Sequence, residues 1–173
     1  MILVRHGQSH FNVTFSVTRV DPGIEDPALT ELGFSQAQKV AAALSREPIR
    51  ELITSPYTRA LQTASVIAAA LGVPVRIEPL VGERGAFACD VGTARDVLMG
   101  RWPQYIFDHM ENEWWPSAES EERLLERCAR FRATMAARHD WRSVAVVSHW
   151  GFIRGLTGLT LTNGEMVPFD PTV

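Results

Sequence analysis

The feature that most constrains the fold is a series of short apolar runs that alternate with segments of helical spacing. Five such runs predict strands: Ile2–Val4, Leu52–Thr54, Val75–Ile77, Val144–Val147 and Met166–Phe169. The unbroken run at 144–147 is typical of a strand that is covered on both faces. Strands that alternate with helices predict an α/β fold, a three-layer α/β/α arrangement with a mostly parallel sheet.

The segments between these runs carry recognisable helix signals. A hydroxyl at Thr30 can cap a helix, and Ser55-Pro56 combines a capping serine with a proline at the first helical position. The spacing predicts further helices over 117–139 and from about 151 to 159. The polar stretch 8–27 contains several breakers, and we expect it to be irregular.

Length and composition indicate one domain over residues 1–173. The chain is 46% apolar with a formal net charge of −3, as in ordinary folded proteins. Neither an internal repeat nor a linker is recognisable. Residues 79–116 have the weakest pattern, and we expect a partly helical cap over one end of the sheet.

The charge balance limits the classes of partner. A mildly acidic chain has no global field that would attract nucleic acid or an anionic membrane, and no stretch approaches the roughly 20 apolar residues of a membrane span. Two cysteines without a CxxC pair favour a reducing compartment. We therefore expect a cytoplasmic protein with no nucleic-acid or membrane partner, and we leave a homo-oligomer open.

Charged side chains follow three of the predicted strands. Arg5 and His6 end the first strand, Arg59 lies in the first turn of the helix after the second, and His149 follows the run 144–147. Because the carboxyl ends of parallel strands meet at one edge, these side chains should converge. Two guanidiniums and a helix N-terminus form an anion site, for which a phosphoryl group is a natural ligand.

Four ordered blocks give this pattern a family resemblance. They read RHGQSHFN over Arg5–Asn12, DPALTELG over Asp26–Gly33, SPYTRALQTA over Ser55–Ala64 and SHWG over Ser148–Gly151. The blocks resemble those of the histidine phosphatase superfamily, which includes phosphoglycerate mutases, and they span most of the chain. The resemblance implies a phosphoglycerate mutase-like fold and phosphoryl transfer through a phosphohistidine.

The resemblance also implies roles for the residues at the strand ends. His6 would be the nucleophile, and Arg5, Arg59 and His149 would bind the transferring oxygens. The chemistry suits these residue types, because imidazole supplies a neutral nitrogen near pH 7 and phosphoryl transfer depends mainly on positioning and charge neutralisation. No metal ion and no cofactor are implied, and the implied partner is a small phosphorylated substrate.

The leaving alkoxide needs a proton, and Glu83 fits the family's pattern for the general acid. Three polar residues could add hydrogen bonds to the phosphoryl group or the substrate: Ser9, Asn12 and Ser55. The sequence departs from the family after Glu83, where residues 85–92 read GAFACDVG. This departure and the short chain favour a phosphatase over a mutase, with a non-catalytic phospholigand-binding module as a further alternative.

Three rival interpretations concern single motifs. Residues Cys89 to Arg95 have the Cys-x5-Arg spacing of cysteine-dependent phosphatases, but no hydrophobic strand precedes them. His6 and His10 have a spacing that binds zinc when both lie on a helix, although the intervening Gly7 argues against one. Trp150 could stack on a substrate or pack in the core, and we favour packing.

Overall fold

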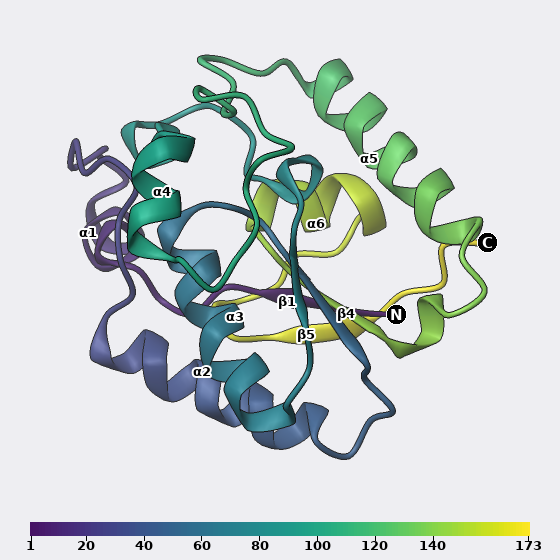
Figure 1. Cartoon of the computed structure of the whole chain (residues 1–173). Helices are drawn as coiled ribbons and strands as arrows, with labels where there is room; N and C mark the ends of the chain where they lie inside the picture. Colours follow the sequence, from purple (N-terminus) through teal and green to yellow (C-terminus); the bar gives the residue numbers. More distant parts are fainter.

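A twisted five-stranded sheet forms the middle layer of the computed structural model, which describes residues 1–173 (Figure 1). Its order is β3-β2-β4-β1-β5, with β5 antiparallel to β1 and the other pairs parallel. The bounds are β1 Ile2–Arg5, β2 Glu51–Thr54, β3 Val75–Ile77, β4 Val144–Ser148 and β5 Met166–Pro168. The predicted strands and the predicted fold class are confirmed.

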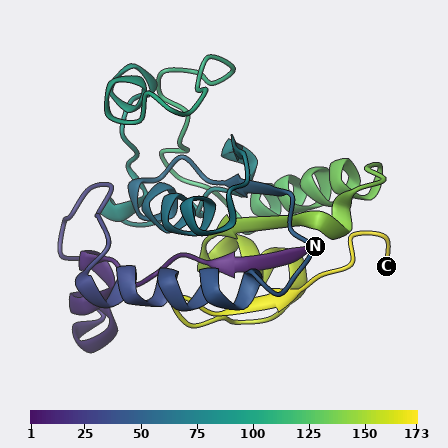
Figure 2. The ribbon, with the colours of Figure 1, turned by 60° about the horizontal axis from the view of Figure 1, so that its bottom comes forward.

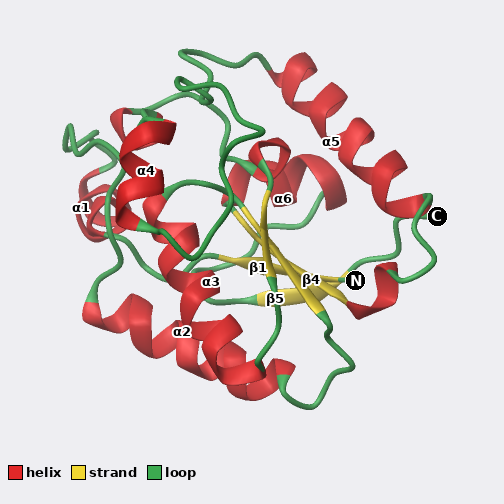
Figure 3. Ribbon diagram, viewed as in Figure 1, coloured by secondary structure: helices red, strands yellow, loops and turns green.

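Helices cover both faces of this sheet (Figure 3). Their bounds are α1 His10–Thr18, α2 Glu31–Leu44, α3 Thr58–Leu71, α4 Arg95–Arg101, α5 Glu121–Ala136 and α6 Trp150–Thr157, with short 3-10 turns η1 Pro79–Val81, η2 Ala88–Asp90 and η3 Trp141–Ser143. Helices α2 and α3 pack on one face, and α5 and α6 pack on the other. No helix is both long and apolar enough to cross a bilayer.

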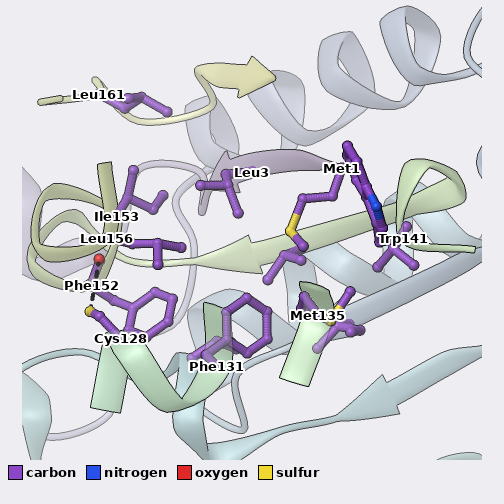
Figure 4. Close-up of a cluster of buried hydrophobic side chains, with 14 of the residues drawn as sticks. Met1, Leu3, Cys128, Phe131, Met135, Trp141, Phe152, Ile153, Leu156 and Leu161 are labelled. Atoms are coloured by element: carbon purple, nitrogen blue, oxygen red, sulfur yellow. Dashed lines mark hydrogen bonds between the residues drawn. The ribbon is translucent and has the colours of Figure 1, made fainter. Parts of the chain in front are cut away.

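Alternating strand residues supply the two cores. In β1, Leu3 points toward α5 and α6, whereas Val4 points toward α2 and α3. Figure 4 shows the first core, in which Phe131 and Phe152 meet edge to face and to which Leu3 of β1 also belongs. Because every residue of β4 is buried, this central strand holds both helical layers in place.

Two expectations for helices were wrong. Residues 10–18 form α1, with Ser9 and Asn12 capping its first turn, although the stretch 8–27 was expected to be irregular. Helix α3 begins at Thr58 rather than at Ser55-Pro56. Its first turn is capped from a distance, because the Asp26 carboxylate accepts hydrogen bonds from both the backbone and the hydroxyl of Thr58. A contact across 32 residues leaves no local signal in the sequence.

The segment 79–116 contains η1, η2 and α4, joined by irregular backbone. Figure 2 shows part of it, in teal and green, extending away from the layered body. The turn between η1 and η2 lies beside the carboxyl end of the sheet, where it lines the cleft described below.

A close contact between two glycines fixes the loop after β1. A Cβ atom on Gly7 would lie 2.3 Å from the Gly33 carbonyl oxygen, and one on Gly33 would lie 2.2 Å from the Gln8 carbonyl oxygen. The Gln8 backbone N–H also donates to the Gln36 side chain, at 2.7 Å. The start of α2 therefore supports the loop that carries His6.

We expect Gly33→Ala to lower the free energy of unfolding by at least about 2 kcal/mol, because backbone atoms on both sides must move. Gly100→Ala is the matched control. It lies in α4 with open space around the added methyl group, and alanine should stabilise that helix by about 0.5–1 kcal/mol. Urea unfolding of both variants measures the difference. Equal stabilities would contradict the close contact.

Candidate active site

The carboxyl ends of β1 and β4 bring two histidines together. Arg5 pairs with Ser148 in the parallel register, and the His6 backbone N–H donates to the Ser148 carbonyl at 3.0 Å. The ring centroids of His6 and His149 lie 5.0 Å apart. The structure thus joins two residues that are 143 positions apart in the chain, as the strand-end argument predicted.

The His6 ring is held in one tautomer. Its Nδ1 lies 2.7 Å from the Gly7 carbonyl oxygen, which can only accept, so Nδ1 carries the proton. Burial, followed by the charges of Arg59 and Arg5, lowers the pKa of His6 well below its ordinary value. The neutral ring therefore has its lone pair on Nε2, the arrangement that a nucleophilic imidazole needs.

The second histidine is packed more deeply. His149 is fully buried, and its Nε2 lies 2.8 Å from the Ser55 hydroxyl. Its Nδ1 is buried without a hydrogen-bond partner. Burial and then the Arg59 charge lower the pKa of His149 well below its ordinary value. This ring is neutral at pH 7 and can exchange a proton or a hydrogen bond with a neighbour.

Two guanidiniums approach the histidines. The Arg5 side chain donates to the Leu161 carbonyl at 2.6 Å, while its buried Nε has no partner. Arg59 is buried, donates to the Cys89 carbonyl at 2.7 Å and forms an ion pair with Asp90 at 3.3 Å. Arg5, Arg59 and His6 line the same cleft, and both arginine charges contribute to the lowered pKa of His6. The cluster is a local concentration of positive charge in an acidic protein.

Glu83 lies on the wall of the same cleft. Its Oε1 accepts backbone hydrogen bonds from Arg84 and Gly151, both at 2.9 Å, and its Oε2 makes none. Burial, followed by the Asp90 charge, raises the pKa of Glu83. A Cβ atom at position 151 would lie 2.3 Å from Oε1, so a larger residue there would displace the Glu83 carboxyl group. The free oxygen of a carboxyl with a raised pKa can carry a proton into the cleft.

These groups line an open cleft of about 750 Å³. Ser9 and Asn12 also line it, and the Asn12 side-chain oxygen accepts hydrogen bonds from Ser9 and from Asn163. Ser55 does not line the cleft, because it is fully buried behind His149. Its hydroxyl positions the His149 ring, and a contact between Ser55 and the substrate stays a prediction.

Asp90 is a cleft residue that the sequence reasoning missed. Besides the ion pair with Arg59, its carboxylate accepts backbone hydrogen bonds from Ala86 and Phe87, at 3.1 and 3.0 Å. The only sequence signal was an acidic residue in the segment that departs from the family. Asp90 ties that segment to the arginine and adds negative charge beside the anion site.

Other residues of the ordered blocks support the site from outside the cleft. The Gly7 backbone N–H donates to the Thr63 hydroxyl at 3.1 Å, and the Leu29 backbone N–H donates to the Gln62 side chain at 2.7 Å. These contacts join the first and second blocks to the third. Three of the four blocks therefore build one connected arrangement around the loop that carries His6.

The structure also answers the three rival interpretations. The Cys89 thiol is buried, which raises its pKa, and Arg95 is engaged by Asp96 and the Met110 carbonyl, so no thiolate phosphate loop forms. His6 precedes α1, so it shares no helical face with the exposed His10. Trp150 was expected to pack in the core, but it is 40% exposed and lines the cleft.

The fold and the site together define an α/β protein with an anion-binding site that is suited to a phosphoryl group. Comparison with known proteins then gives the family. The model of the histidine phosphatase superfamily (branch 1) matches residues 1–170. The chain belongs to this superfamily, as its four blocks indicated.

Relatives within the family carry different activities in their names. Phosphoserine phosphatase 1 of Hydrogenobacter thermophilus is 32% identical over 154 residues, which cover 86% of this chain and 70% of the relative. The 2,3-bisphosphoglycerate-dependent phosphoglycerate mutase of Thermoplasma acidophilum is 30% identical over 176 residues, which cover 98% of this chain and 86% of the relative. Family membership alone therefore includes both phosphatases and mutases.

A solved structure has the same fold. The mycobacterial glucosyl-3-phosphoglycerate phosphatase complexed with VO3 superimposes with a TM-score of 0.69 at 22% identity. The match covers 96% of this chain and 88% of the other. The similarity supports the architecture described above.

Proposed function

We propose that this protein is a phosphatase that hydrolyses a small phosphomonoester through a phosphohistidine on His6, without a metal ion. The observation that carries the proposal is the convergence of a neutral, oriented His6 with Arg5, Arg59 and His149 beside the carboxyl of Glu83. The names of the relatives support phosphoryl transfer but leave hydrolysis and mutase activity to be separated.

In the first step, His6 Nε2 attacks phosphorus while the ester P–O bond breaks. Arg5, Arg59 and His149 offset the charge on the transferring oxygens, which is the main requirement of this reaction. Glu83 gives its proton to the leaving oxygen, so the product leaves as a neutral alcohol and Glu83 becomes a carboxylate. The raised pKa of Glu83 keeps the required proton in place before the reaction.

In the second step, the Glu83 carboxylate accepts a proton from water, and the water oxygen attacks phosphorus. The P–N bond to His6 breaks, inorganic phosphate leaves, and protonated Glu83 and neutral His6 are restored. One carboxyl thus serves as acid and then as base, which its place at the open cleft allows.

The charges in the cleft favour hydrolysis over a mutase reaction. A mutase must retain a bisphosphate intermediate, and this requires uncommitted cations around both phosphates. Here Arg59 is paired with Asp90, and Arg84 is paired with Glu121 at 2.9 Å. Asp90 and Glu83 also place two carboxyl groups in the cleft. Arg19, which is exposed on the cleft lining, is the one further arginine that a second phosphate could meet without a competing carboxylate, whereas water has open access.

The test is phosphate release from p-nitrophenyl phosphate with a chelator present, together with mass spectrometry of the enzyme after a quench without acid. We expect release and a protein species one phosphoryl group heavier, with the modification on His6. Complete inhibition by the chelator contradicts metal independence. Isomer exchange stimulated by a bisphosphate and faster than phosphate release identifies a mutase. Phosphate binding without turnover or phosphoenzyme identifies a binding module.

The pH dependence of Asp90→Asn is a further prediction. Glu83 must be protonated to act as the acid, so kcat/KM falls as pH rises through its pKa. Asp90 helps to raise that pKa, and its removal should therefore move the descending limb to lower pH. The ascending limb, set by loss of the proton from His6, should move less, because the named causes of the lowered pKa of His6 are burial, Arg59, Arg5 and the hydrogen bond to Gly7.

The shift of the descending limb is measured by profiles of kcat/KM against pH for Asp90→Asn. The control is Asp96→Asn, because Asp96 is an exposed residue of α4. Asparagine retains an oxygen that can accept the hydrogen bonds from Ala86 and Phe87, so the loop should keep its conformation. A descending limb that does not move, or that moves to higher pH, contradicts the assignment of Glu83.

A further inference from the structure

Three phenylalanines form a continuous wall on one side of the cleft. Phe11 and Phe15 lie one turn apart on α1, and their rings stack with centroids 5.0 Å apart. The ring centroid of Phe87 lies 4.9 Å from that of Phe15 and 5.8 Å from that of Phe11. All three line the cleft that contains His6. We call Phe11, Phe15 and Phe87 the aromatic wall. Neither the sequence analysis nor the proposed chemistry assigns it a role.

The aromatic wall leaves apolar surface open to water. Phe11 is nearly buried and fixes the wall to the body of the protein, whereas Phe87 is 43% exposed. Trp150, which follows His149 directly, adds a second exposed aromatic ring to the cleft. Exposed aromatic area inside a concave site is unfavourable in water, and a bound apolar group would remove that cost.

The position of the wall relates it to the leaving group. Glu83 must face the leaving oxygen to protonate it, and Phe87 follows it by only four residues in the same segment. That segment is held against the site by the Asp90 carboxylate, which accepts the Phe87 backbone N–H at 3.0 Å. A group attached to the leaving oxygen would therefore extend toward the aromatic wall.

The charges nearby favour an uncharged ring over a second anion. Arg84 is engaged by Glu121 and by the Glu119 carbonyl. Arg19 is exposed at the mouth of the cleft, and its guanidinium lies 5.9 Å from the centre of the Phe15 ring, where it adds to the aromatic surface. A carboxylate or a second phosphate would meet phenyl faces rather than a built cationic pocket.

We propose that the aromatic wall binds an aromatic ring carried by the leaving group, so that the preferred substrates are phosphomonoesters of alcohols that bear such a ring. This inference rests on the proposed function. The selectivity comes from two effects. The ring of the leaving group stacks on Phe15 and Phe87, and its surface is removed from water. The phosphoryl site contributes equally to all esters, so the aromatic wall decides among them.

The test compares 3-phenylpropyl phosphate with propyl phosphate, whose alcohols are of nearly equal acidity, so that leaving-group chemistry does not differ. We expect kcat/KM to be about 10- to 100-fold higher for the phenyl ester. The ester of 3-cyclohexylpropanol separates ring stacking from apolar area, and it should fall between the two. Equal values for all three esters, or a cyclohexyl ester as good as the phenyl ester, overturn the proposal.

Variants locate the selectivity. Phe15→Leu and Phe87→Leu keep apolar volume but remove the ring faces, and each should reduce the ratio of kcat/KM for the phenyl ester to that for the propyl ester about 5- to 10-fold. Phe34→Leu is the matched control, because Phe34 is an exposed phenylalanine of α2 outside the cleft. If the phenyl-to-propyl ratio of kcat/KM is unchanged in both Phe15→Leu and Phe87→Leu, the aromatic wall does not bind the ring of the leaving group.

Failure of the proposed function is distinguishable from failure of this inference. If the protein hydrolyses p-nitrophenyl phosphate but does not prefer 3-phenylpropyl phosphate to propyl phosphate, the phosphatase proposal is supported and the proposed role of the aromatic wall is contradicted. If no ester turns over, calorimetry with 3-phenylpropyl and propyl phosphonate measures the same selectivity by binding alone. Tighter binding of the phenyl phosphonate, weakened by Phe87→Leu, supports the aromatic wall, and equal binding contradicts it.

Discussion

Replacing His6 with alanine is expected to lower kcat/KM for phosphomonoesters by about 10⁴-fold or more, with no phosphoryl group on the protein after reaction. In the proposed mechanism the reaction passes through a bond from phosphorus to His6 Nε2, and no neighbouring group can replace this nitrogen. His149 has its Nε2 held by Ser55 and is fully buried. The arginines bind the phosphoryl group but cannot attack it.

Two further variants separate lost chemistry from lost folding. His6→Asn keeps a polar side chain of similar size and should be equally inactive, with a thermal unfolding midpoint close to that of the parent. His10→Ala changes a second histidine in the same block that is exposed at the start of α1, and it should be fully active. Phosphatase activity that survives in a folded His6→Asn protein but disappears in Cys89→Ser would reassign the nucleophile.

Replacing Glu83 with glutamine is expected to slow hydrolysis of alkyl phosphates by about 10²–10³-fold, because the amide cannot protonate the leaving alkoxide. The same change should affect p-nitrophenyl phosphate differently. p-Nitrophenolate leaves without a proton, so the first step stays fast, whereas the second step loses its base. We expect a burst of p-nitrophenolate equal to the enzyme concentration, followed by slow turnover and an accumulated phosphoenzyme.

The controls for Glu83→Gln are chosen on geometry. Glu111→Gln removes a carboxylate from an exposed position in the irregular segment after α4 and should leave both substrates unaffected. Glutamine at position 83 retains an oxygen that can accept from Arg84 and Gly151, so the cleft wall should keep its shape. Equal slowing of alkyl and p-nitrophenyl esters with no burst contradicts a proton-transfer role.

The strand ends were predictable because their signal is local. Apolar runs that stop at Arg5, at Thr54 and at Ser148 mark buried strands, and parallel strands necessarily deliver their carboxyl ends to one edge. The convergence of His6 and His149 follows from this rule together with the four ordered blocks. The register of Arg5 with Ser148 confirms it at the level of single residues.

The missed elements depend on contacts that are distant in sequence. Helix α1 has a weakly amphipathic sequence, and it is held by packing of Phe11 and Phe15 against Phe87. The start of α3 is set by the Asp26 carboxylate rather than by Ser55. In each case a tertiary partner supplies the stabilisation that local propensity lacks, and such a partner has no fixed spacing in the chain.

The roles of three residues were likewise decided by the fold. Ser55 has the residue type of a substrate contact but lies behind His149. Asp90 has no motif of its own, yet its side chain meets Arg59 inside the cleft. Trp150 has the composition of a core residue but remains exposed on the cleft wall. Which side of a loop faces the cleft depends on packing around it.

By itself, the sequence determined the layered α/β fold, the family and the residues at the strand ends, because apolar periodicity and strand direction act over a few residues. Only the tertiary structure decided the protonated nitrogen of His6, the pairing of Arg59 with Asp90 and the aromatic wall beside the cleft. Those properties depend on burial and on distances between side chains brought together from separate segments, and both are set when the three layers pack.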